Sequence, residues 1–286
     1  MPILDDLKFQ YKTGGIAQKL IFLNVALYII ALPLFYSFSY KAFVYPSWLA
    51  LSSSLDSFGL NPWTVFSYMF LHAGFLHLLF NMMVLHFAGR LFSTFFTQRQ
   101  MLGLYILTGI FSGLVFVGVY SMLGISTKLV GASGAIMGVL IATAVYAPYM
   151  ELRLALIGRV KLWQVALVLL LFDLVQLPIE NSGGHLAHLA GALFGFIYIK
   201  TLQRGFDLSK PISILQDFFE DLQKPKKKKP PFKAVHRNGN INTTTKTNFK
   251  KDINQKKIDD ILDKISQSGY DSLTKEEKEF LFKAGK

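Results

Sequence analysis

The chain has 286 residues, of which 52% are hydrophobic, and it carries a formal net charge of +12. Several apolar runs are long enough to cross a bilayer, which argues against a soluble protein. The sequence contains no cysteine. Disulfides, thiolate nucleophiles, iron–sulfur clusters and cysteine-type zinc sites are therefore excluded, and covalent chemistry needs another nucleophile.

Six apolar segments of roughly 16–23 residues follow one another along the chain. They are Leu20–Tyr36, Phe75–Leu91, Met101–Leu123, Val130–Tyr149, Leu162–Leu177 and His185–Thr201. A hydrocarbon core of about 30 Å requires a helix of about this length. A backbone in lipid must also satisfy its hydrogen bonds internally. We therefore expect an all-α integral membrane protein with six helices, the first of them a retained helix and not a cleaved signal peptide.

Basic residues gather on one side of the expected helices. Lys8, Lys12, Lys19, Arg90, Arg99, Arg153, Arg159, Lys161, Lys200 and Arg204 fall on this side, and only Lys41 and Lys128 fall on the other. The positive-inside rule then predicts that both termini are cytoplasmic. The loop Ser37–Thr64 is outside, and its aromatic residues indicate either that it lies in the membrane interface or that it only covers helix ends.

The composition changes after the sixth segment. Residues 205–254 include the basic run Lys226–Lys229 and are predicted to form a largely disordered linker. Its lysines either lie near anionic lipid or only solubilise the chain. Residues 255–286 regain helical spacing, with Gly269 as a stop and Thr274 and Glu277 as a capping box. They predict a small cytoplasmic helical hairpin.

Five of the six histidines lie in or beside the apolar segments. They are His72, His77, His86, His185 and His188. Ionisable groups in hydrocarbon cost several kcal/mol unless they are paired or hydrated. This placement favours a hydrated site inside the bundle.

His77 and Asn81 are four residues apart and so share one face of a helix. Two neutral donors aimed at one point suit a developing oxyanion. The alternative is a polar clamp between helices. His86 lies about 180° around the helix from His77 and is interpreted as structural.

Ser133 lies in the sequence Gly131-Ala132-Ser133-Gly134, just after a loop. A serine at a helix start has an exposed hydroxyl, free backbone N–H groups nearby and the positive end of the helix dipole. A nucleophile with an oxyanion site needs these features. A simple helix cap is the alternative interpretation.

The sixth segment places His188 on a stripe of small residues. The stripe contains Gly191, Ala192 and Gly195, and the fourth segment carries a matching face with Gly134 and Gly138. Small faces let two helix backbones approach closely, which would bring His188 within reach of Ser133. A packing stripe with a satisfied histidine is the alternative.

We expect neither a metal nor another cofactor. A His-Glu-x-x-His motif is absent from the sequence, and the second, fourth and sixth segments contain no carboxylate. A haem bound by His72, His77, His185 or His188 would leave Ser133 without a role.

Three motifs together resemble those of the rhomboid family of intramembrane serine proteases. They are His72-(four residues)-His77-(three residues)-Asn81, then Gly131-Ala132-Ser133-Gly134, then Ala187-His188-Leu189-Ala190-Gly191. The resemblance covers residues 17–204, which we expect to form a six-helix protease domain after a cytoplasmic segment of residues 1–16.

The resemblance implies a water-filled cavity that opens outward in the cell (inner) membrane. It implies that Ser133 is the nucleophile and His188 the general base of a dyad without a third acid. His77, Asn81 and the Ser133 N–H would hold the oxyanion, and Gly131 would shape the turn. The implied substrates are single-span membrane proteins, cut near the outer face, and no nucleic acid is expected as a partner. The oligomeric state stays open.

Three positions depart from this pattern or bear on it. Met137 stands where many family members have a tyrosine that supports the histidine, and Thr64 replaces the arginine of a Trp-Arg pair. Asp173 is expected to be a wet residue at the interface, outside the dyad. A catalytically silent relative that binds membrane segments is one alternative, and a channel, transporter or cofactor carrier is another.

Overall fold

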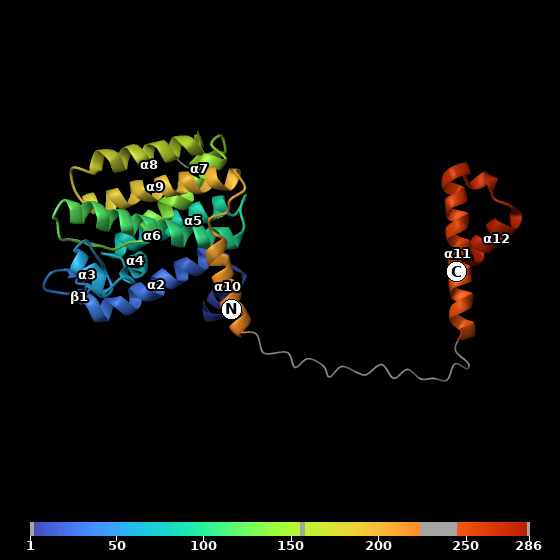
Figure 1. Cartoon of the computed structure of the whole chain (residues 1–286), viewed down its shortest axis with the longest axis horizontal. Coiled ribbons are helices and arrows are strands. Elements are labelled where there is room, and N and C mark those ends of the chain that lie inside the picture. The colour runs from blue at the N-terminus through green and yellow to red at the C-terminus, as the bar shows by residue number, and fades with distance from the viewer. Residues whose placement is uncertain (1–2, 155–157, 224–244, 285–286) are drawn as a thin grey trace. The chain divides into compact units, whose positions relative to one another are not determined.

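The computed structural model describes residues 3–154, 158–223 and 245–284. The chain divides into two compact units, Met1–Pro225 and Lys226–Lys286. The first unit is a helical bundle and the second contains a helical hairpin (Figure 1). The candidate site lies in the first unit.

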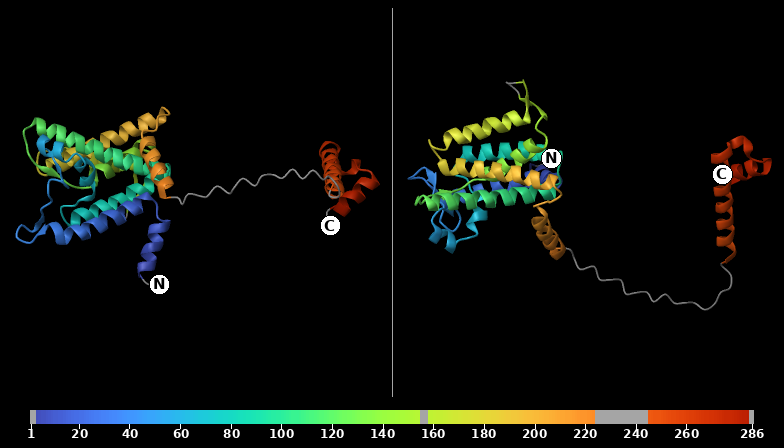
Figure 2. Two further views of the ribbon diagram at one scale, coloured as in Figure 1. Left: turned by 60° about the horizontal axis from the view of Figure 1, so that its bottom comes forward. Right: turned by 45° about the horizontal axis from the view of Figure 1, so that its top comes forward.

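Among the described residues of the first unit, four helices are long and apolar enough to cross a membrane. They are α2 (Ile16–Phe35), α5 (Phe75–Phe92), α6 (Gln98–Met122) and α9 (Ser182–Gln203). Two apolar helices are shorter: α7 (Ser133–Tyr146) has 14 residues and α8 (Leu162–Gln176) has 15. The long helices run side by side (Figure 2). This arrangement indicates a multi-pass membrane protein.

Each predicted apolar segment overlaps one of these helices, but the fourth helix is shorter than expected. It begins at Ser133 and not at Val130, because Gly131 has a φ of +134°, outside the range of a right-handed helix. It ends before Pro148, a residue that restricts its predecessor to extended conformations.

Helix α7 is the centre of the bundle and contacts α5, α6, α8 and α9. Its residues from Gly134 to Ala144 are all buried. Its small and apolar side chains meet neighbouring helices on every side. The residues at its N-terminus are therefore held by four neighbouring helices.

The closest approach in the bundle is between α7 and α9. A Cβ atom at Gly191 would collide with the carbonyl oxygen of Gly134, and one at Gly195 would collide with that of Gly138. The two backbones are in direct contact, as the small-residue faces predicted.

Gly191→Ala is expected to destabilise the bundle by about 1–3 kcal/mol, because the added methyl group must separate two backbones. Gly118→Ala in α6 is the matched control, since no atom of a neighbouring described element lies within 4 Å of its Cβ position. Thermal unfolding in detergent, followed by circular dichroism, compares the two. Equal melting temperatures would contradict the close contact.

The long loop after α2 is ordered and connects to the start of α7. It contains β1 (Tyr36–Ser37), β2 (Ala42–Phe43), β3 (Leu51–Ser52), α3 (Leu55–Leu60), α4 (Thr64–Ser67) and the 3₁₀ helix η1 (Tyr68–Phe70). Strand β1 pairs with β2, and β3 pairs with β4 (Lys128–Leu129), both antiparallel. The Tyr45 hydroxyl donates to the carbonyl of His72 at 2.9 Å. The loop thus fixes the segments that lead into α5 and α7.

Besides the loop after α2, two further helices and a pair of strands among the described residues lie outside the six apolar helices. Helix α1 (Ile3–Thr13) precedes α2, and strands β5 (Glu151–Leu154) and β6 (Gly158–Lys161) pair between α7 and α8. Helix α10 (Lys210–Gln223) follows α9 and contacts α6.

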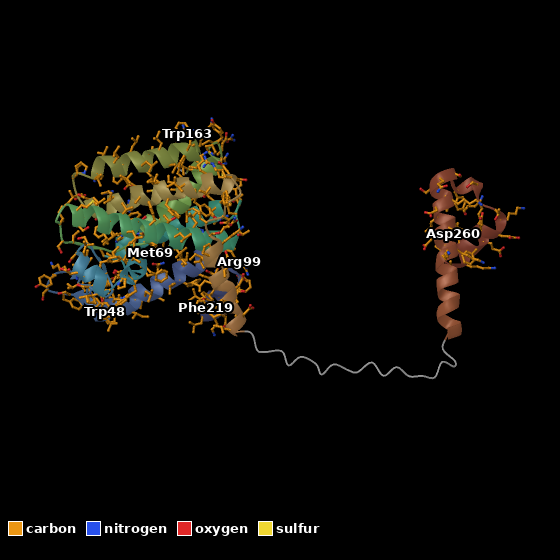
Figure 3. The ribbon with its side chains drawn as sticks, in the orientation of Figure 1. Trp48, Met69, Arg99, Trp163, Phe219 and Asp260 are labelled. Carbon is orange, nitrogen blue, oxygen red and sulfur yellow. The ribbon has the colours of Figure 1, made fainter. Side chains whose placement is uncertain are left out.

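Helix α10 lies within the predicted linker. Residues 205–254 were expected to be largely disordered, but α10 occupies Lys210–Gln223, and another helix begins at Thr245. Ile214, Phe218 and Leu222 recur at helical spacing, which explains α10. Arg99 of α6 forms an ion pair with Asp217 of α10 at 2.6 Å. The exposed side chain of Phe219 also belongs to α10 (Figure 3). The basic run at residues 226–229 lies outside the described residues.

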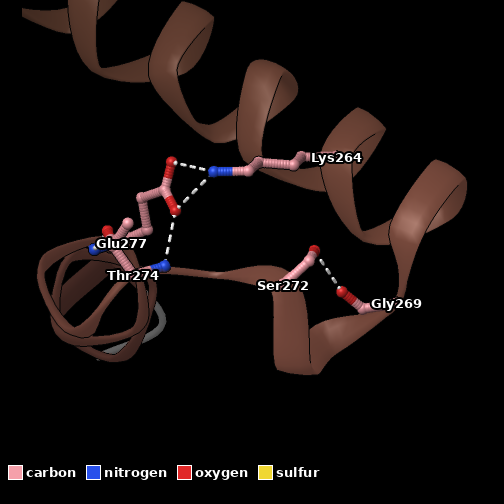
Figure 4. A network of polar contacts seen from close by, with 5 residues as sticks. All are labelled: Lys264, Gly269, Ser272, Thr274 and Glu277. Carbon is pink, nitrogen blue, oxygen red and sulfur yellow. Dashed lines mark hydrogen bonds and ion pairs between the residues drawn. The ribbon is translucent and has the colours of Figure 1, made fainter.

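The second unit contains α11 (Thr245–Ser268), η2 (Tyr270–Ser272) and α12 (Lys275–Ala284). Gly269 ends α11 with a φ of +75°. Thr274 N–H donates to Glu277 at 2.7 Å, and Lys264 contacts the same carboxylate at 3.0 Å (Figure 4). The Thr274 hydrogen bond and the Lys264 ammonium hold the pKa of Glu277 below its ordinary value. These bonds fix the angle between α11 and α12.

Candidate functional site

A cavity of about 780 Å³ opens between α5, α7, α8 and α9. Its lining includes the polar residues His77, Asn81, Ser133, Asp173, His185 and His188. Residues from three predicted motifs, more than 100 positions apart along the chain, therefore face one space. His86 is exposed and lines a different cavity, with Arg90 and Gln98.

Ser133 is the first residue of α7 and is partly buried. The preceding turn requires glycine at position 131, because its φ of +134° is unfavourable for any residue with a Cβ atom. That Cβ position is 3.0 Å from Nε2 of His77 and 3.5 Å from Oγ of Ser133. Gly131 therefore leaves open the space between the His77 ring and the Ser133 hydroxyl. Its own N–H donates to the carbonyl of Tyr68 at 3.0 Å.

His188 lies at the level of Ser133 along the contact between α7 and α9. The carbonyl oxygen of Ala187 is 3.1 Å from the Cβ position of Gly134. Ala187 directly precedes His188, and Gly134 directly follows Ser133. The side chains of Ser133 and His188 both line the cavity. The backbone contact that places these residues side by side is the one that the glycine spacing predicted.

The prediction for Asp173 was wrong. This residue was expected to be wet, but it is 2% exposed. Its Oδ1 atom lies 2.7 Å from Nδ1 of His185 and 2.7 Å from Nδ1 of His188. Its position near the end of α8 suggested solvent, whereas the rotation of α8 turns it toward α9. A carboxylate in an otherwise apolar helix was the signal that could have identified it.

The ring of His77 has a defined tautomer. The N–H of Ala73 donates to Nδ1 of His77 at 3.3 Å. In a neutral ring Nε2 then carries the proton, and Nε2 is the atom that faces Gly131. His72 is fully buried, and its ring packs edge-on against His77 at 5.3 Å between centroids.

Asn81 uses part of its hydrogen-bonding capacity within its own helix. Its Nδ2 donates to the carbonyl oxygen of His77 at 2.8 Å. An amide nitrogen has two N–H groups, so one remains for the cavity. The two predicted donors are thus neighbours, and His77 is the one whose N–H is directed at the turn before Ser133.

The contacts of Asp173 with His185 and His188 also make these three residues a candidate set of metal ligands. One atom each from Asp173, His185 and His188 can be chosen so that all three lie within 4.8 Å of one another. The sequence prediction of no metal did not consider this set, because Asp173 was placed outside the site. The distances of 2.7 Å from Oδ1 to each Nδ1 are those of hydrogen bonds.

The two other departures from the motif pattern also have defined places. Met137 is 9% exposed and lines the cavity one helical turn after Ser133. Thr64 is 1% exposed and its hydroxyl donates to the carbonyl of Asn61 at 2.6 Å. Thr64 therefore stabilises the turn that precedes α4. Unlike the arginine of the family pattern, it carries no charge.

Comparison with known protein families identifies the family to which the helical bundle belongs. The family model of the Rhomboid domain matches residues 60–205, a range that contains α5 to α9 and the polar residues of the cavity. A model described as a family of unknown function (DUF6576) matches residues 243–283. Comparison with curated proteins gives no significant match. The chain belongs to the rhomboid family, and this membership supports an intramembrane protease.

Proposed function

We propose that this protein is a serine-type intramembrane endopeptidase with Ser133 as nucleophile and His188 as general base. The observation that carries the proposal is the shared level of Ser133 and His188 at the α7–α9 contact, in one cavity. All six apolar helices cross the membrane in this proposal, and the short central helix α7 carries Ser133 inside the bundle.

The reaction is a two-step acyl transfer. Ser133 Oγ forms a bond to the carbonyl carbon of the substrate while its proton moves to Nε2 of His188. The C–N bond then breaks, and the same proton passes to the leaving amine. Water enters through the cavity and hydrolyses the acyl-enzyme by the same route, with His188 again taking and returning the proton.

Neutral donors stabilise the charge that develops on the carbonyl oxygen. The Nε2–H of His77 and the free N–H of Asn81 come from α5, and the Ser133 N–H comes from the start of α7. The first N–H groups of a helix have no acceptor within the helix, and they lie at the positive end of its dipole. Donors fixed in advance in a site of low polarity provide a large part of catalysis.

Residues outside the long helices support a place of cleavage. Thr127, Lys128 and Asn181 line the cavity, and they lie in the segments before α7 and α9 that the positive-inside rule places outside. We propose single-span membrane proteins as substrates, cut near the outer face of the inner membrane, with both termini of the enzyme in the cytoplasm. Phe80, Phe116 and Phe172 also line the cavity and suit an apolar substrate segment.

A fluorophosphonate probe tests the nucleophile directly. The purified full chain in detergent is expected to form one covalent adduct, and mass spectrometry of its peptides should place the adduct on Ser133. Ser133→Ala is expected to remain unlabelled at an unchanged melting temperature. A folded wild-type protein that takes no probe and cleaves no single-span substrate would favour the silent, segment-binding alternative.

A further inference from the structure

Asp173 is a buried carboxylate at the depth of the site. It lies on α8, is 2% exposed, and its Oδ1 contacts two histidines of α9 at 2.7 Å. Ionisable groups inside a membrane protein are costly unless they are paired, and they mark functional positions. His185 and His188 are three residues apart, so both point from one face of α9 toward α8.

This contact determines the tautomer of His188. An ionised carboxylate only accepts hydrogen bonds, so Nδ1 of His188 must carry a proton and donate it. In the neutral ring Nε2 is then unprotonated. A general base for Ser133 needs its acceptor nitrogen free and its ring held in one orientation. Asp173 supplies both conditions.

His185 holds the carboxylate in turn. Its Nδ1 donates to the same Oδ1 atom, and its ring lies 5.7 Å from the His188 ring, almost perpendicular to it at 84°. Two donors on one oxygen restrain the rotation of the Asp173 side chain. Met137, the residue one turn after Ser133, offers only a weakly accepting thioether, so the orienting contact to His188 comes from α8.

We propose that Asp173 is a positioning residue that completes a Ser133–His188–Asp173 hydrogen-bonded triad, with His185 restraining the carboxylate. The proposal rests on the proposed protease function. It adds a buried carboxylate to the expected dyad, so that α8 orients the His188 ring while Ser133 lines the same cavity. Asp173 does not contact the substrate carbonyl in this arrangement and acts through His188.

The test compares Asp173→Asn with wild type in the full chain, reconstituted with a single-span substrate. We expect kcat to fall on the order of 10²-fold, because the amide can present an N–H to Nδ1 and favour the wrong tautomer. KM is expected to stay within about 3-fold, since substrate contacts are unchanged. Glu180→Gln is the matched control, because it removes an exposed carboxylate outside the cavity lining, next in the chain to Asn181, which lines it.

The pH profile separates positioning from mere packing. The groups that face His188 are Asp173 on α8, His185 on α9, His77 on α5 and Ser133 on α7. Asp173→Asn should change the shape of the kcat profile against pH, whereas the loss of a residue that only packs should leave that shape as in wild type. Asp173→Glu keeps the charge and is expected to recover part of the rate.

Each outcome bears on one proposal. If Asp173→Asn destabilises the fold, titration with the fluorophosphonate probe gives kcat per active molecule and keeps the comparison valid. Unchanged kcat and an unchanged shape of the pH profile, in a series where Ser133→Ala is inactive, would overturn the triad and leave the protease intact. Loss of wild-type cleavage with EDTA, restored by Zn²⁺, would instead make the cluster a metal site and overturn the triad. An inactive wild type would overturn the proposed function itself.

Discussion

Alanine in place of Ser133 is expected to lower the rate of substrate cleavage by a factor on the order of 10⁴ or more. The hydroxyl is the only atom of the proposed site that forms a bond to the substrate, and alanine leaves nothing to replace it. His188→Ala should have a similar effect, because the hydroxyl then keeps its proton at neutral pH. Both variants remove few packing contacts from a cavity wall, so the fold should persist.

The double variant Ser133→Ala/His188→Ala gives a sharper measurement than either single variant. Residues that act as one unit are strongly non-additive, so the double variant should be no slower than the single ones. Initial rates with a fluorogenic single-span substrate in proteoliposomes measure all three. Additive losses in the double variant, or residual cleavage within about 10-fold of wild type in Ser133→Ala, would show that the two residues do not share one reaction step.

Much of the fold was predictable because it depends on local sequence. Apolar length alone indicates a membrane helix, since a helix in lipid must satisfy its own backbone. The contact between α7 and α9 was predictable from glycine spacing, because only small residues allow two backbones to touch. That contact joins the residues that adjoin Ser133 and His188 in the chain, Gly134 and Ala187, and the roles of Ser133 and His188 stay predictions.

The carboxylate in an apolar helix could mark Asp173 as a candidate, but the side of α8 on which it lies was not predictable because α8 gives no rotational reference. A helix that is apolar on nearly every side has no polar stripe to show which face meets its neighbours. The position of Asp173 along α8 can be predicted from the sequence, but the face of the helix that carries its side chain cannot. Only the packing of α8 on α9 turns its carboxylate toward His185 and His188.

Helix α10 was not predicted, for a different reason. Charge runs and prolines dominated the interpretation of residues 205–254, although Ile214, Phe218 and Leu222 carry a helical period. Helix α10 also depends on partners far away in sequence, such as Arg99. A single exposed ion pair contributes at most about 1 kcal/mol, so the amphipathic period is the stronger signal.

The two proposed oxyanion donors of α5 should differ in their contributions. Nε2 of His77 carries a proton because Nδ1 accepts from Ala73, and this N–H faces the turn before Ser133. Asn81 already spends one N–H on the carbonyl of His77. The carbonyl oxygen of a bound substrate gains its negative charge only in the transition state, so the loss of a donor should reduce kcat more than it raises KM.

His77→Phe is therefore expected to lower kcat by roughly 10²–10³, the effect of losing one well-placed oxyanion donor. Asn81→Ala should lower kcat by a smaller factor of about 10, since its amide is only partly available and the gap admits water to the oxyanion. His86→Phe is the control on the same helix, because His86 is exposed and lies outside the cavity lining. Labelling by the fluorophosphonate probe should slow in the same order, because its phosphoryl oxygen occupies the place of the oxyanion. A larger loss for Asn81→Ala than for His77→Phe would mean that the amide, and not the imidazole, is the principal donor, and that the tautomer assigned to His77 is wrong.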